Sequence, residues 1–512
     1  MSESIYLTTP LYYVNAQPHL GHTYTTVVVD TLARFHRSMG RRVMFQTGTD
    51  EHGDKIAAAA AAAGEEPRAY AGRIAEVFRS TWDTCGISYD HFIRTTDPYH
   101  VEFVRDVLRR IYDSGDIYFG EYGGNYCTGC ERFYTERELA DGKCPDHETE
   151  PTWIKEENYF FRMERYRTRL LEHLESNPGF IRPEGYRNEV MGLLREPLED
   201  LCISRPKKRL SWGIELPFDP GYVTYVWFDA LLNYVSGLRH ARPEQADSLW
   251  PRANHFIAKD ILKPHAVFWP TMLMAADIPL FEGLKVHGYW NMGESKMSKS
   301  LGNVIRPLEM HKRFGLDGFR YFLMRDMVFG QDSNFTEDAF VVRFNADLSN
   351  GLGNLASRVL SMQHRYFSGV VQAAEGLLQP GDEELREAFE EAETAAKEHL
   401  DQLALHLALE TIWRAVAACD KYVVETAPFK LWKSEEARPR VGVILHVLCD
   451  ALRHTARLIA PFMPETAGKL AAMLDAEPGT LAEAAPPWTK TFLPGHRVAK
   501  PEPLFPRIET EG

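Results

Sequence analysis

Apolar and polar residues near the start of the chain follow one another in a pattern that predicts a strand, a helix and a second strand. Residues 5–8 form a short apolar run typical of a buried strand, and residues 43–45 form another. Between them, apolar residues recur at helical spacing from about residue 23 until Gly40 ends the helix. This β-loop-α-β unit is the building block of an open, mostly parallel sheet.

A second unit of the same kind follows later in the chain. It consists of a strand at residues 255–258, a helix at about 263–276 and a strand at 284–287. Open α/β sheets bind their ligands beyond the carboxyl ends of the strands. The residues at these ends are therefore candidates for ligand contacts: Asp260, His287 and Gly288.

The segments before and after the second unit differ from it in residue composition and in the pattern of apolar residues. Residues 116–224 are rich in Gly, Tyr and charge, which is typical of an insertion, and long amphipathic helices begin at about residue 346. One apolar stripe runs from Leu400 to Cys419, whereas residues 370–384 look like a loop. We therefore predict a Rossmann-type domain split into two halves, residues 1–115 and 225–290, with an insertion between them at residues 116–224. A linking segment at residues 291–345 and an all-α bundle at residues 346–512 follow.

Composition narrows the class of protein. A chain of 512 residues with 44% hydrophobic content can bury several cores. It starts without the basic and apolar regions of a signal peptide and has no run of 18 apolar residues, so we expect a cytoplasmic protein without a membrane span. The net charge of −14 argues against indiscriminate polyanion binding but leaves room for a nucleic acid held by a local basic face.

Three of the seven cysteines lie close together and predict a metal site. Cys127 and Cys130 form one pair, and Cys144 with His147 forms a second, which is the spacing of two knuckles around one tetrahedral Zn²⁺. Four protein ligands leave no open position, so we expect one structural zinc per chain. The alternatives are a small cysteine-containing core and a nucleic-acid-binding zinc finger, which the surrounding acidic residues disfavour.

Two motifs indicate phosphate binding. His19-Leu20-Gly21-His22 falls at the start of the first predicted helix, where free N–H groups and the helix dipole attract anions. Lys296-Met297-Ser298-Lys299-Ser300 supplies two cations in a small-residue loop that could close over a nucleotide. Either motif alone occurs by chance or as surface chemistry. Together they indicate ATP activation of an acid, in which an ionised carboxylate needs no general base and the protein positions groups and neutralises charge.

Several motifs in a fixed order extend this interpretation to a family. Besides the two phosphate motifs, they are residues 47–53 (TGTDEHG), residues 225–230 (YVWFDA), Lys259-Asp260 and Phe268-Trp269-Pro270. In this order they resemble bacterial methionyl-tRNA synthetases of class I, of the single zinc knuckle type, over essentially the whole chain. The resemblance implies formation of methionyl-adenylate from methionine and ATP with Mg²⁺, followed by esterification of tRNA(Met).

The resemblance also implies roles for individual residues. His19, His22, Lys296 and Lys299 would be catalytic and would bind ATP together with Gly21, Asp260, His287 and Gly288. Asp50 would bind the α-amino group of methionine in a pocket lined by Leu11, Tyr13, Trp227, Ala230, Tyr234, Ile261 and His265. Tyr234 or His265 could offer the thioether sulfur a weak hydrogen bond. Spacing alone would assign Trp227 and Ile261 to ordinary core.

In the helical region, Asn354 and Arg358 stand four residues apart and share a helix face. The resemblance implies that they read the CAU anticodon. Phe429 falls where many relatives have a tryptophan that stacks on an anticodon base, and Trp432 is a possible substitute. Without the resemblance, helix packing or a solvated face explains these residues.

Two rival functions can be separated from the expected one. Another class I synthetase, of the cysteine or leucine type, would support pyrophosphate exchange with a different amino acid. The insertion is too small for the hydrolytic editing domain of the branched-chain types. A non-catalytic tRNA-binding paralogue would not need the charged phosphate motifs. The chain ends soon after the bundle without a dimerising module, so we expect a monomer.

Overall fold

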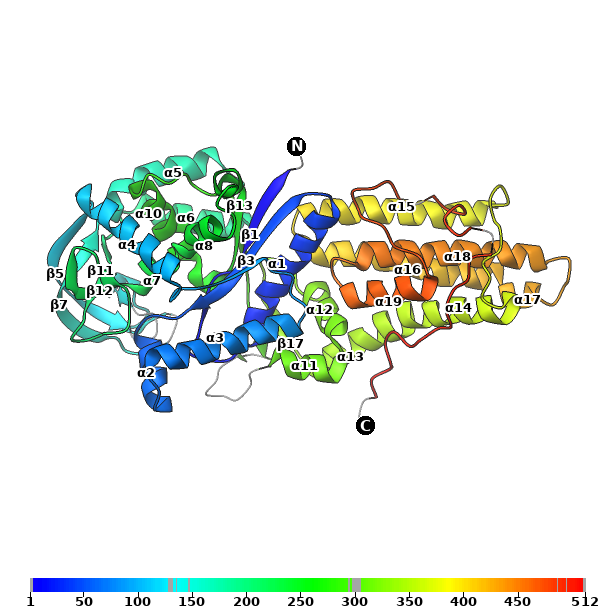
Figure 1. The fold of residues 1–512 in the computed structure, drawn as a ribbon, viewed down its shortest axis with the longest axis horizontal. Helices are drawn as coiled ribbons and strands as arrows, with labels where there is room; N and C mark the ends of the chain where they lie inside the picture. The colour runs from blue at the N-terminus through cyan, green and yellow to red at the C-terminus, as the bar shows by residue number, and fades with distance from the viewer. Residues whose placement is uncertain are drawn as a thin grey trace. The chain divides into compact units, whose positions relative to one another are not determined.

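The computed structural model describes residues 3–127, 132–134, 136–145, 148–292, 295–296, 305–485, 487–493 and 495–509. The chain forms two compact units (Figure 1). The first, which we call the sheet unit, contains Glu3–Val29 and Val43–Gly288. The second, the helical unit, contains Asp30–Arg42 and the described residues from Tyr289 onward.

A seven-stranded sheet organises the described part of the sheet unit, in the order β2-β3-β1-β13-β14-β8, with β4 also paired to β3. Parallel pairing joins β1 to β13, β13 to β14, β14 to β8, and β3 to both β2 and β4. The parallel α/β prediction is therefore confirmed. The strands are β1 (Ser4–Thr8), β2 (Tyr12–Tyr13), β3 (Arg42–Asp50), β4 (His91–Arg94), β8 (Ile181–Arg182), β13 (Ala253–Ala258) and β14 (Gly283–His287).

Helices pack around this sheet. They are α1 (Leu20–Ser38), α2 (Asp54–Ala63), α3 (Pro67–Thr84), α4 (Pro98–Asp113), α7 (Val226–Ala230), α8 (Asn233–Ala241), α9 (Ala246–Leu249), η3 (Trp250–Arg252) and α10 (Trp269–Ala275). Helix α1 begins three residues before the predicted start, because the His19 carbonyl already accepts hydrogen bonds from the Thr23 N–H and hydroxyl at 3.0 Å. The helix predicted at 263–276 is a π-helix, η5 (Pro264–Phe268), continued by α10 and preceded by the 3₁₀ turn η4 (Lys259–Ile261).

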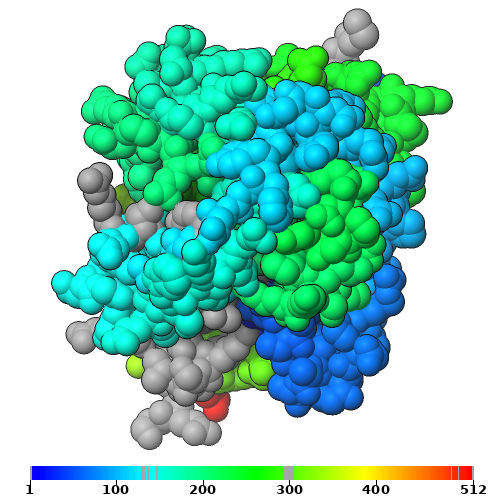
Figure 2. All heavy atoms as spheres, turned by 90° about the vertical axis from the view of Figure 1, so that its left-hand side faces the viewer, coloured from blue at the N-terminus to red at the C-terminus, as the bar shows by residue number. Residues whose placement is uncertain are grey.

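The predicted insertion is mostly antiparallel. One sheet has the order β6-β5-β7-β9 and another the order β10-β12-β11. In Figure 2 the insertion (cyan to teal) forms much of the face turned to the viewer. Its elements are β5 (Ile117–Cys127), β6 (Arg132–Tyr134), η1 (Glu136–Glu138), β7 (Thr152–Phe161), η2 (Met163–Tyr166), α5 (Arg167–Ser176), α6 (Glu184–Arg195), β9 (Leu201–Cys202), β10 (Ser204–Pro206), β11 (Glu215–Leu216) and β12 (Asp219–Thr224).

One strand of the insertion leaves its antiparallel sheets and joins the main sheet. In β8, Ile181 and Arg182 pair with Leu284 and Lys285 of β14. Buried residues of α5 and α6, such as Leu170 and Leu194, belong to the same hydrophobic core as Leu284. Residues of the predicted insertion therefore share one core with the parallel sheet.

The helical unit is a bundle, as predicted, preceded by a small sheet of order β16-β15-β17. Its elements are β15 (Trp290–Met292), β16 (Ser295–Lys296), α11 (Pro307–Phe314), α12 (Leu316–Arg325), β17 (Ser333–Phe335), α13 (Glu337–Arg343), η7 (Phe344–Gly353), α14 (Asn354–Phe367), α15 (Pro380–Asp401), α16 (Leu405–Thr426), α17 (Pro428–Leu431), α18 (Arg438–Ile459) and α19 (Pro464–Leu474). No helix in the described part of the chain is both long and apolar enough to cross a membrane.

Two local predictions in the helical unit are wrong. The stripe from Leu400 to Cys419 belongs to two helices, because the chain turns between α15 and α16, where Leu403 has a φ of 63°. The predicted loop at 370–384 ends early: α15 begins at Pro380, with a capping box between Gln379 and Asp382. The capping residues satisfy free N–H groups of the first turn, so the helix starts within a stretch that looks like a loop.

A buried ion pair ties α1 to α12 within the helical unit. Asp30 and Arg320 are both fully buried and their side chains are 2.8 Å apart. The Arg320 guanidinium also donates to the Phe462 carbonyl at 2.7 Å and the Pro461 carbonyl at 3.3 Å. This pair fixes the second half of α1 to the turn that precedes α19.

Candidate active site

The first phosphate motif lies at the N-terminus of α1. The rings of His19 and His22 stack with centroids 3.7 Å apart, and His19 Nδ1 accepts a hydrogen bond from the Gly21 N–H at 3.1 Å. A Cβ on Gly21 would approach the His19 ring to 3.1 Å, so the glycine leaves room for this close arrangement. Two imidazoles at the positive end of a 19-residue helix form a place where phosphate binding is favourable.

Strand β2 connects this helix end with Asp50. The Tyr12 ring lies 4.8 Å from the His22 ring, and its hydroxyl donates to the His22 carbonyl at 3.2 Å. The next residue, Tyr13, is the register partner of Asp50 at the end of β3. Leu11 directly precedes this strand, and the Asp50 side chain is buried. The structure thus brings Tyr13 and Asp50, both predicted from the resemblance, to the same edge of the sheet as the histidine motif.

His287, at the end of β14, contacts the same helix. Its Nδ1 donates to the Gly288 carbonyl at 2.7 Å, because a carbonyl can only accept, and its Nε2 therefore accepts from the Thr25 hydroxyl at 2.7 Å. Burial lowers the pKa of His287 to about 4, so the ring is neutral near pH 7. Its side chain fixes the first turns of α1 to the carboxyl end of β14.

Aromatic residues gather around His265 in the π-helix η5. His265 Nδ1 donates to the Ile261 carbonyl at 2.9 Å, so in the neutral ring Nε2 accepts from the Tyr234 hydroxyl at 2.8 Å. Burial lowers the pKa of His265 to about 4 and raises that of Tyr234 above its usual value. Both polar hydrogens are therefore already used. The hydrogen bond expected from either side chain to a thioether is not available in this arrangement.

Helix α7 contributes Trp227 and Ala230. The Trp227 ring meets the His265 ring edge-on with centroids 5.8 Å apart, and Trp227 is only partly buried. Ala230 is buried, whereas Asp260 in η4 is exposed. The predicted pocket residues therefore combine a buried polar pair, Tyr234 and His265, with a partly accessible indole.

Sequence reasoning missed a buried carboxylate beside this group. Asp229, on α7, lies 2.7 Å from Nδ1 of His52 and 2.8 Å from Nε2 of His100. Asp229 lies in the YVWFDA motif and His52 in the TGTDEHG motif, and this was the sequence signal that could have marked them as site residues. His100 lies in neither motif, so there was no reason in the sequence to select it.

The lysine motif is only partly described. Lys296 forms β16 and pairs with Asn291 of β15, but its side-chain position is not described, and Lys299 lies outside the described residues. The meeting of the lysines with the histidine motif stays a prediction.

Two of the four expected zinc ligands lie within the described residues. Cys127 and Cys144 are both buried, in one small cluster with Tyr134, whose hydroxyl lies 3.5 Å from the Cys144 sulfur. Cys130 and His147 lie outside the described residues. In the part of the chain that is described, no group of three or more His, Cys, Asp or Glu side chains could hold a metal ion.

In the helical unit, Asn354 is exposed at the start of α14, and Arg358 forms an ion pair with Asp420 of α16 at 3.0 Å. Phe429, on α17, is 47% exposed. Trp432 is partly buried: the Tyr366 ring stacks on it at 4.6 Å, and the Arg438 guanidinium lies 5.0 Å from its ring centre. Phe429 therefore has the more accessible aromatic face.

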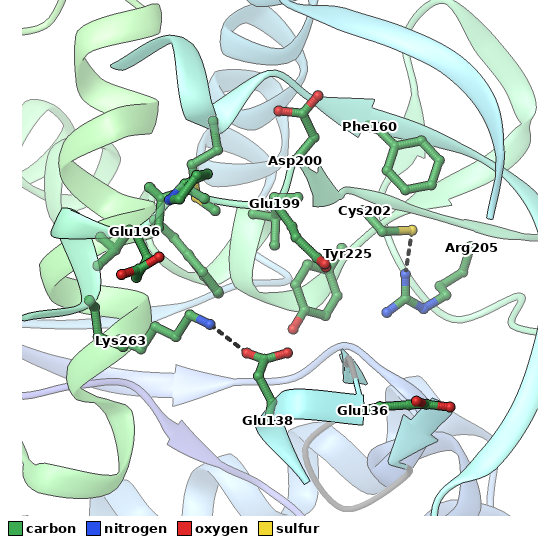
Figure 3. A pocket seen from close by; sticks show the side chains of 17 residues that line it. Glu136, Glu138, Phe160, Glu196, Glu199, Asp200, Cys202, Arg205, Tyr225 and Lys263 are labelled. Carbon is green, nitrogen blue, oxygen red and sulfur yellow. Dashed lines mark hydrogen bonds and ion pairs between the residues drawn. The ribbon is translucent and has the colours of Figure 1, made fainter. Parts of the chain in front are cut away.

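In the sheet unit, a pocket of about 900 Å³ opens between the insertion and η5 (Figure 3). Apolar side chains such as Phe160 and Phe268 line it, together with the carboxylates of Glu196, Glu199 and Asp200. Lys263 bridges it by an ion pair with Glu138 at 2.8 Å. None of the predicted site residues lines this pocket, so its volume does not mark the predicted ATP and methionine sites.

Comparison with known proteins covers nearly the whole chain. The model of class I tRNA synthetases (M) matches residues 5–152 and 146–360, and that of the anticodon binding domain of methionyl tRNA ligase matches residues 373–512. The methionine–tRNA ligase of Caldanaerobacter subterraneus subsp. tengcongensis is 43% identical over 517 positions, covering 100% of this chain and 80% of that protein. That of Deinococcus radiodurans is also 43% identical, covering 98% and 74%.

Solved structures of methionyl-tRNA synthetases are also similar to this chain over nearly its whole length. Mycobacterium tuberculosis methionyl-tRNA synthetase in complex with methionyl-adenylate superposes with a TM-score of 0.93 at 40% identity, covering 99% of this chain and 100% of that one. The apo form of that enzyme gives a TM-score of 0.86 at 37% identity, covering 100% and 99%. On these matches, this chain belongs to the methionyl-tRNA synthetase family of class I.

Proposed function

We propose that this chain ligates methionine to tRNA(Met) at the sheet edge where α1, β2 and β3 end. The methionine carboxylate attacks the α-phosphate of ATP, pyrophosphate leaves, and the methionyl group of the resulting adenylate passes to the 3′ end of tRNA(Met). One observation carries the assignment: β2 joins the His19–His22 pair to Asp50, through the Tyr12–His22 ring contact and the Tyr13–Asp50 register.

The phosphate side of the site consists of His19, Gly21 and His22. The attacking carboxylate is already ionised at neutral pH, so its attack needs no general base, and the protein instead stabilises negative charge on the phosphates. The positive end of the α1 dipole and the two imidazoles serve this role. Lys296 and Lys299 add positive charge as pyrophosphate leaves, and Mg²⁺ accompanies ATP.

The remaining ATP contacts come from the ends of β13 and β14. Asp260 binds the ribose, and its exposure after β13 supports this role. His287 and Gly288 border the nucleotide through their backbone, because both nitrogens of the His287 ring are hydrogen-bonded. The His287 side chain thereby holds the first turns of α1 next to the carboxyl end of β14, where the phosphates bind.

Methionine binds between α7, η4 and η5. Asp50 receives its α-amino group, and Leu11, Tyr13, Trp227, Ala230, Tyr234, Ile261 and His265 line the slot for its side chain. The neutral His265 supports this assignment, since a charged ring would be costly beside an apolar thioether. Shape and dispersion contacts with Trp227, rather than a hydrogen bond to sulfur, then select the unbranched side chain.

Anticodon recognition falls to Asn354, Arg358 and Phe429. The exposed Phe429 ring supports stacking on a base, whereas Trp432 serves to hold α17 against Tyr366. Arg358 exchanges its partner Asp420 for RNA, because a half-exposed pair costs little to separate.

A single structural Zn²⁺ is proposed for the insertion, held by Cys127, Cys130, Cys144 and His147. The fit rests on the two described thiols, which are both buried in one cluster and are of the ligand type that structural zinc sites use. When bound, the ion would cross-link the insertion and supply no catalytic water. Elemental analysis of the purified protein should give about one zinc per chain, and its absence would contradict this site. We also propose that the enzyme acts in the cytoplasm.

Methionine-dependent ATP–pyrophosphate exchange tests the proposed function. Methionine should support exchange, while leucine and cysteine should not. Aminoacylation should then require a CAU anticodon, with an anticodon-swapped tRNA as the control. Exchange supported by another amino acid would overturn the pocket assignment, and equal charging of both tRNAs would overturn the anticodon assignment.

A further inference from the structure

A chain of buried polar groups lies outside the residues assigned above. It consists of His52, His100, Asp229 and Ser236, which we call the Asp229 network. The Asp229 carboxylate contacts His52 Nδ1 at 2.7 Å through one oxygen and His100 Nε2 at 2.8 Å through the other. His100 Nδ1 in turn lies 2.7 Å from the Ser236 hydroxyl. All four residues are buried, and Asp229 and His100 are 0% exposed.

The chemistry of these contacts fixes the charge on Asp229. Burial opposes ionisation of the carboxyl, but His52 and His100 outweigh it and lower its pKa below the usual value. The carboxylate is therefore an anion that only accepts, so both imidazoles donate to it. Hydrogen bonds to a buried charged acceptor are among the stronger ones in proteins.

The network joins the elements that form the proposed methionine pocket. His52 follows Asp50 by two residues at the end of β3, and Asp229 lies between Trp227 and Ala230 on α7. Ser236 follows Tyr234 by two residues on α8. The network therefore connects the neighbours of the pocket side chains without including any of them.

A second set of hydrogen bonds strengthens the same connection. The side-chain amide of Gln46, on β3, donates to the side chain of Asn233 at 2.9 Å. Asn233 in turn donates to the Ala230 carbonyl at 2.6 Å. This second set fixes the start of α8 to β3 and to the end of α7, while Asp229 ties the middle of α7 to His52 and His100.

We propose that Asp229 is a positioning residue for methionine, which holds α7, and with it Trp227, at a fixed distance from Asp50. This inference rests on the proposed pocket assignment and adds a residue to it. Asp229 acts through His52 and His100 and does not contact the substrate. Its loss should weaken methionine binding selectively, because ATP is bound by α1 and by the ends of β13 and β14.

The matched test compares two buried carboxylates in the sheet unit. In Asp229→Asn, the N–H group of the new amide faces the N–H group of one of the two imidazoles, so one hydrogen bond is lost. This variant should raise the KM for methionine in pyrophosphate exchange about tenfold. The KM for ATP should stay within about twofold of the wild-type value. Asp116→Asn is the control. Asp116 is 3% exposed and accepts from the Tyr166 hydroxyl at 2.6 Å within the insertion, so its loss should leave both KM values unchanged.

An unchanged KM for methionine in Asp229→Asn, or an equal rise in both KM values, would overturn the inference. If Asp229→Asn does not fold, the pair His52→Asn and His52→Ala decides. An asparagine amide keeps a donor near the position of Nδ1, so it should retain the wild-type KM for methionine, whereas alanine should raise it. Equal values for the two variants would overturn the inference. Failure of wild-type exchange with methionine would instead overturn the proposed function.

Discussion

The buried pair of Asp30 and Arg320 allows a quantitative test of how the helical unit is stabilised. Both side chains are fully buried and 2.8 Å apart. Asp30→Ala would leave the Arg320 charge without its carboxylate partner in a place that water does not reach. We expect this single substitution to lower the stability of the helical unit strongly.

The structure sets the magnitude. Removing one partner of a buried ion pair costs about 3 to 5 kcal/mol. The lower end applies here, because Arg320 keeps hydrogen bonds to the Phe462 and Pro461 carbonyls. The second partner of Asp30, Arg34, is partly exposed and adds little. About 3 kcal/mol corresponds to a fall of about 6 to 12 °C in Tm for a unit of this size.

Thermal unfolding followed by circular dichroism measures this effect. Asp401→Ala is the matched control, because Asp401 pairs with Arg41 in the same unit at 3.6 Å but is 53% exposed, so its Tm should fall by no more than about 4 °C. Asp30→Asn keeps an oxygen for Arg320 and should fall between wild type and Asp30→Ala. A fall in Asp30→Ala no larger than that in Asp401→Ala would refute the reasoning.

Three further predictions concern function and pH. Lys299→Ala should fold normally but slow methionine-dependent exchange about 10²- to 10³-fold, and unchanged kinetics would remove Lys299 from the site. Phe429→Ala should lower kcat/KM for tRNA about 5- to 150-fold without affecting exchange, because a base-stacking ring contributes about 1 to 3 kcal/mol. Trp432→Ala should mainly lower Tm. A loss of tRNA charging in Trp432→Ala but not in Phe429→Ala would assign the stacking role to Trp432. Burial raises the pKa of Asp450 to about 7, so the folded state binds its proton more tightly than the unfolded chain. Its contribution to stability is complete below about pH 4 and is lost as the pH rises through 7. Asp450→Asn, which still accepts from the Thr489 N–H, should flatten the dependence of Tm on pH over this range; an unaltered slope would assign the dependence to other groups.

The main sheet could be predicted because its strands are short apolar runs and its first helix has a clear apolar stripe. Residues 5–8 and 284–287 were predicted within one residue of β1 and β14. The break at Leu403 could not be read from periodicity, because an apolar residue in a left-handed turn continues the stripe. Strand β8 has only two residues, too few for any periodic pattern.

The neighbourhood of the candidate site could be predicted, because its residues were singled out by sequence motifs and by the resemblance. The structure brings His19, His22, Tyr13 and Asp50 to one edge of the sheet through β2, while their roles stay predictions. Roles that depend on hydrogen-bond partners could not be predicted. The choice of tautomer in His265, for example, follows from the Ile261 carbonyl, which no sequence pattern reveals.

The pairing of β8 with β14 makes the insertion part of the catalytic scaffold. Deleting residues 116–224 to obtain a minimal enzyme would remove this edge strand and expose the N–H and C=O groups of β14 to water and to other chains. Because His287 at the end of β14 also anchors α1, the damage would extend to the first turns of α1, where we propose that the phosphates bind. Truncation studies should therefore keep Ile181 and Arg182, together with α5 and α6, and shorten only the antiparallel hairpins.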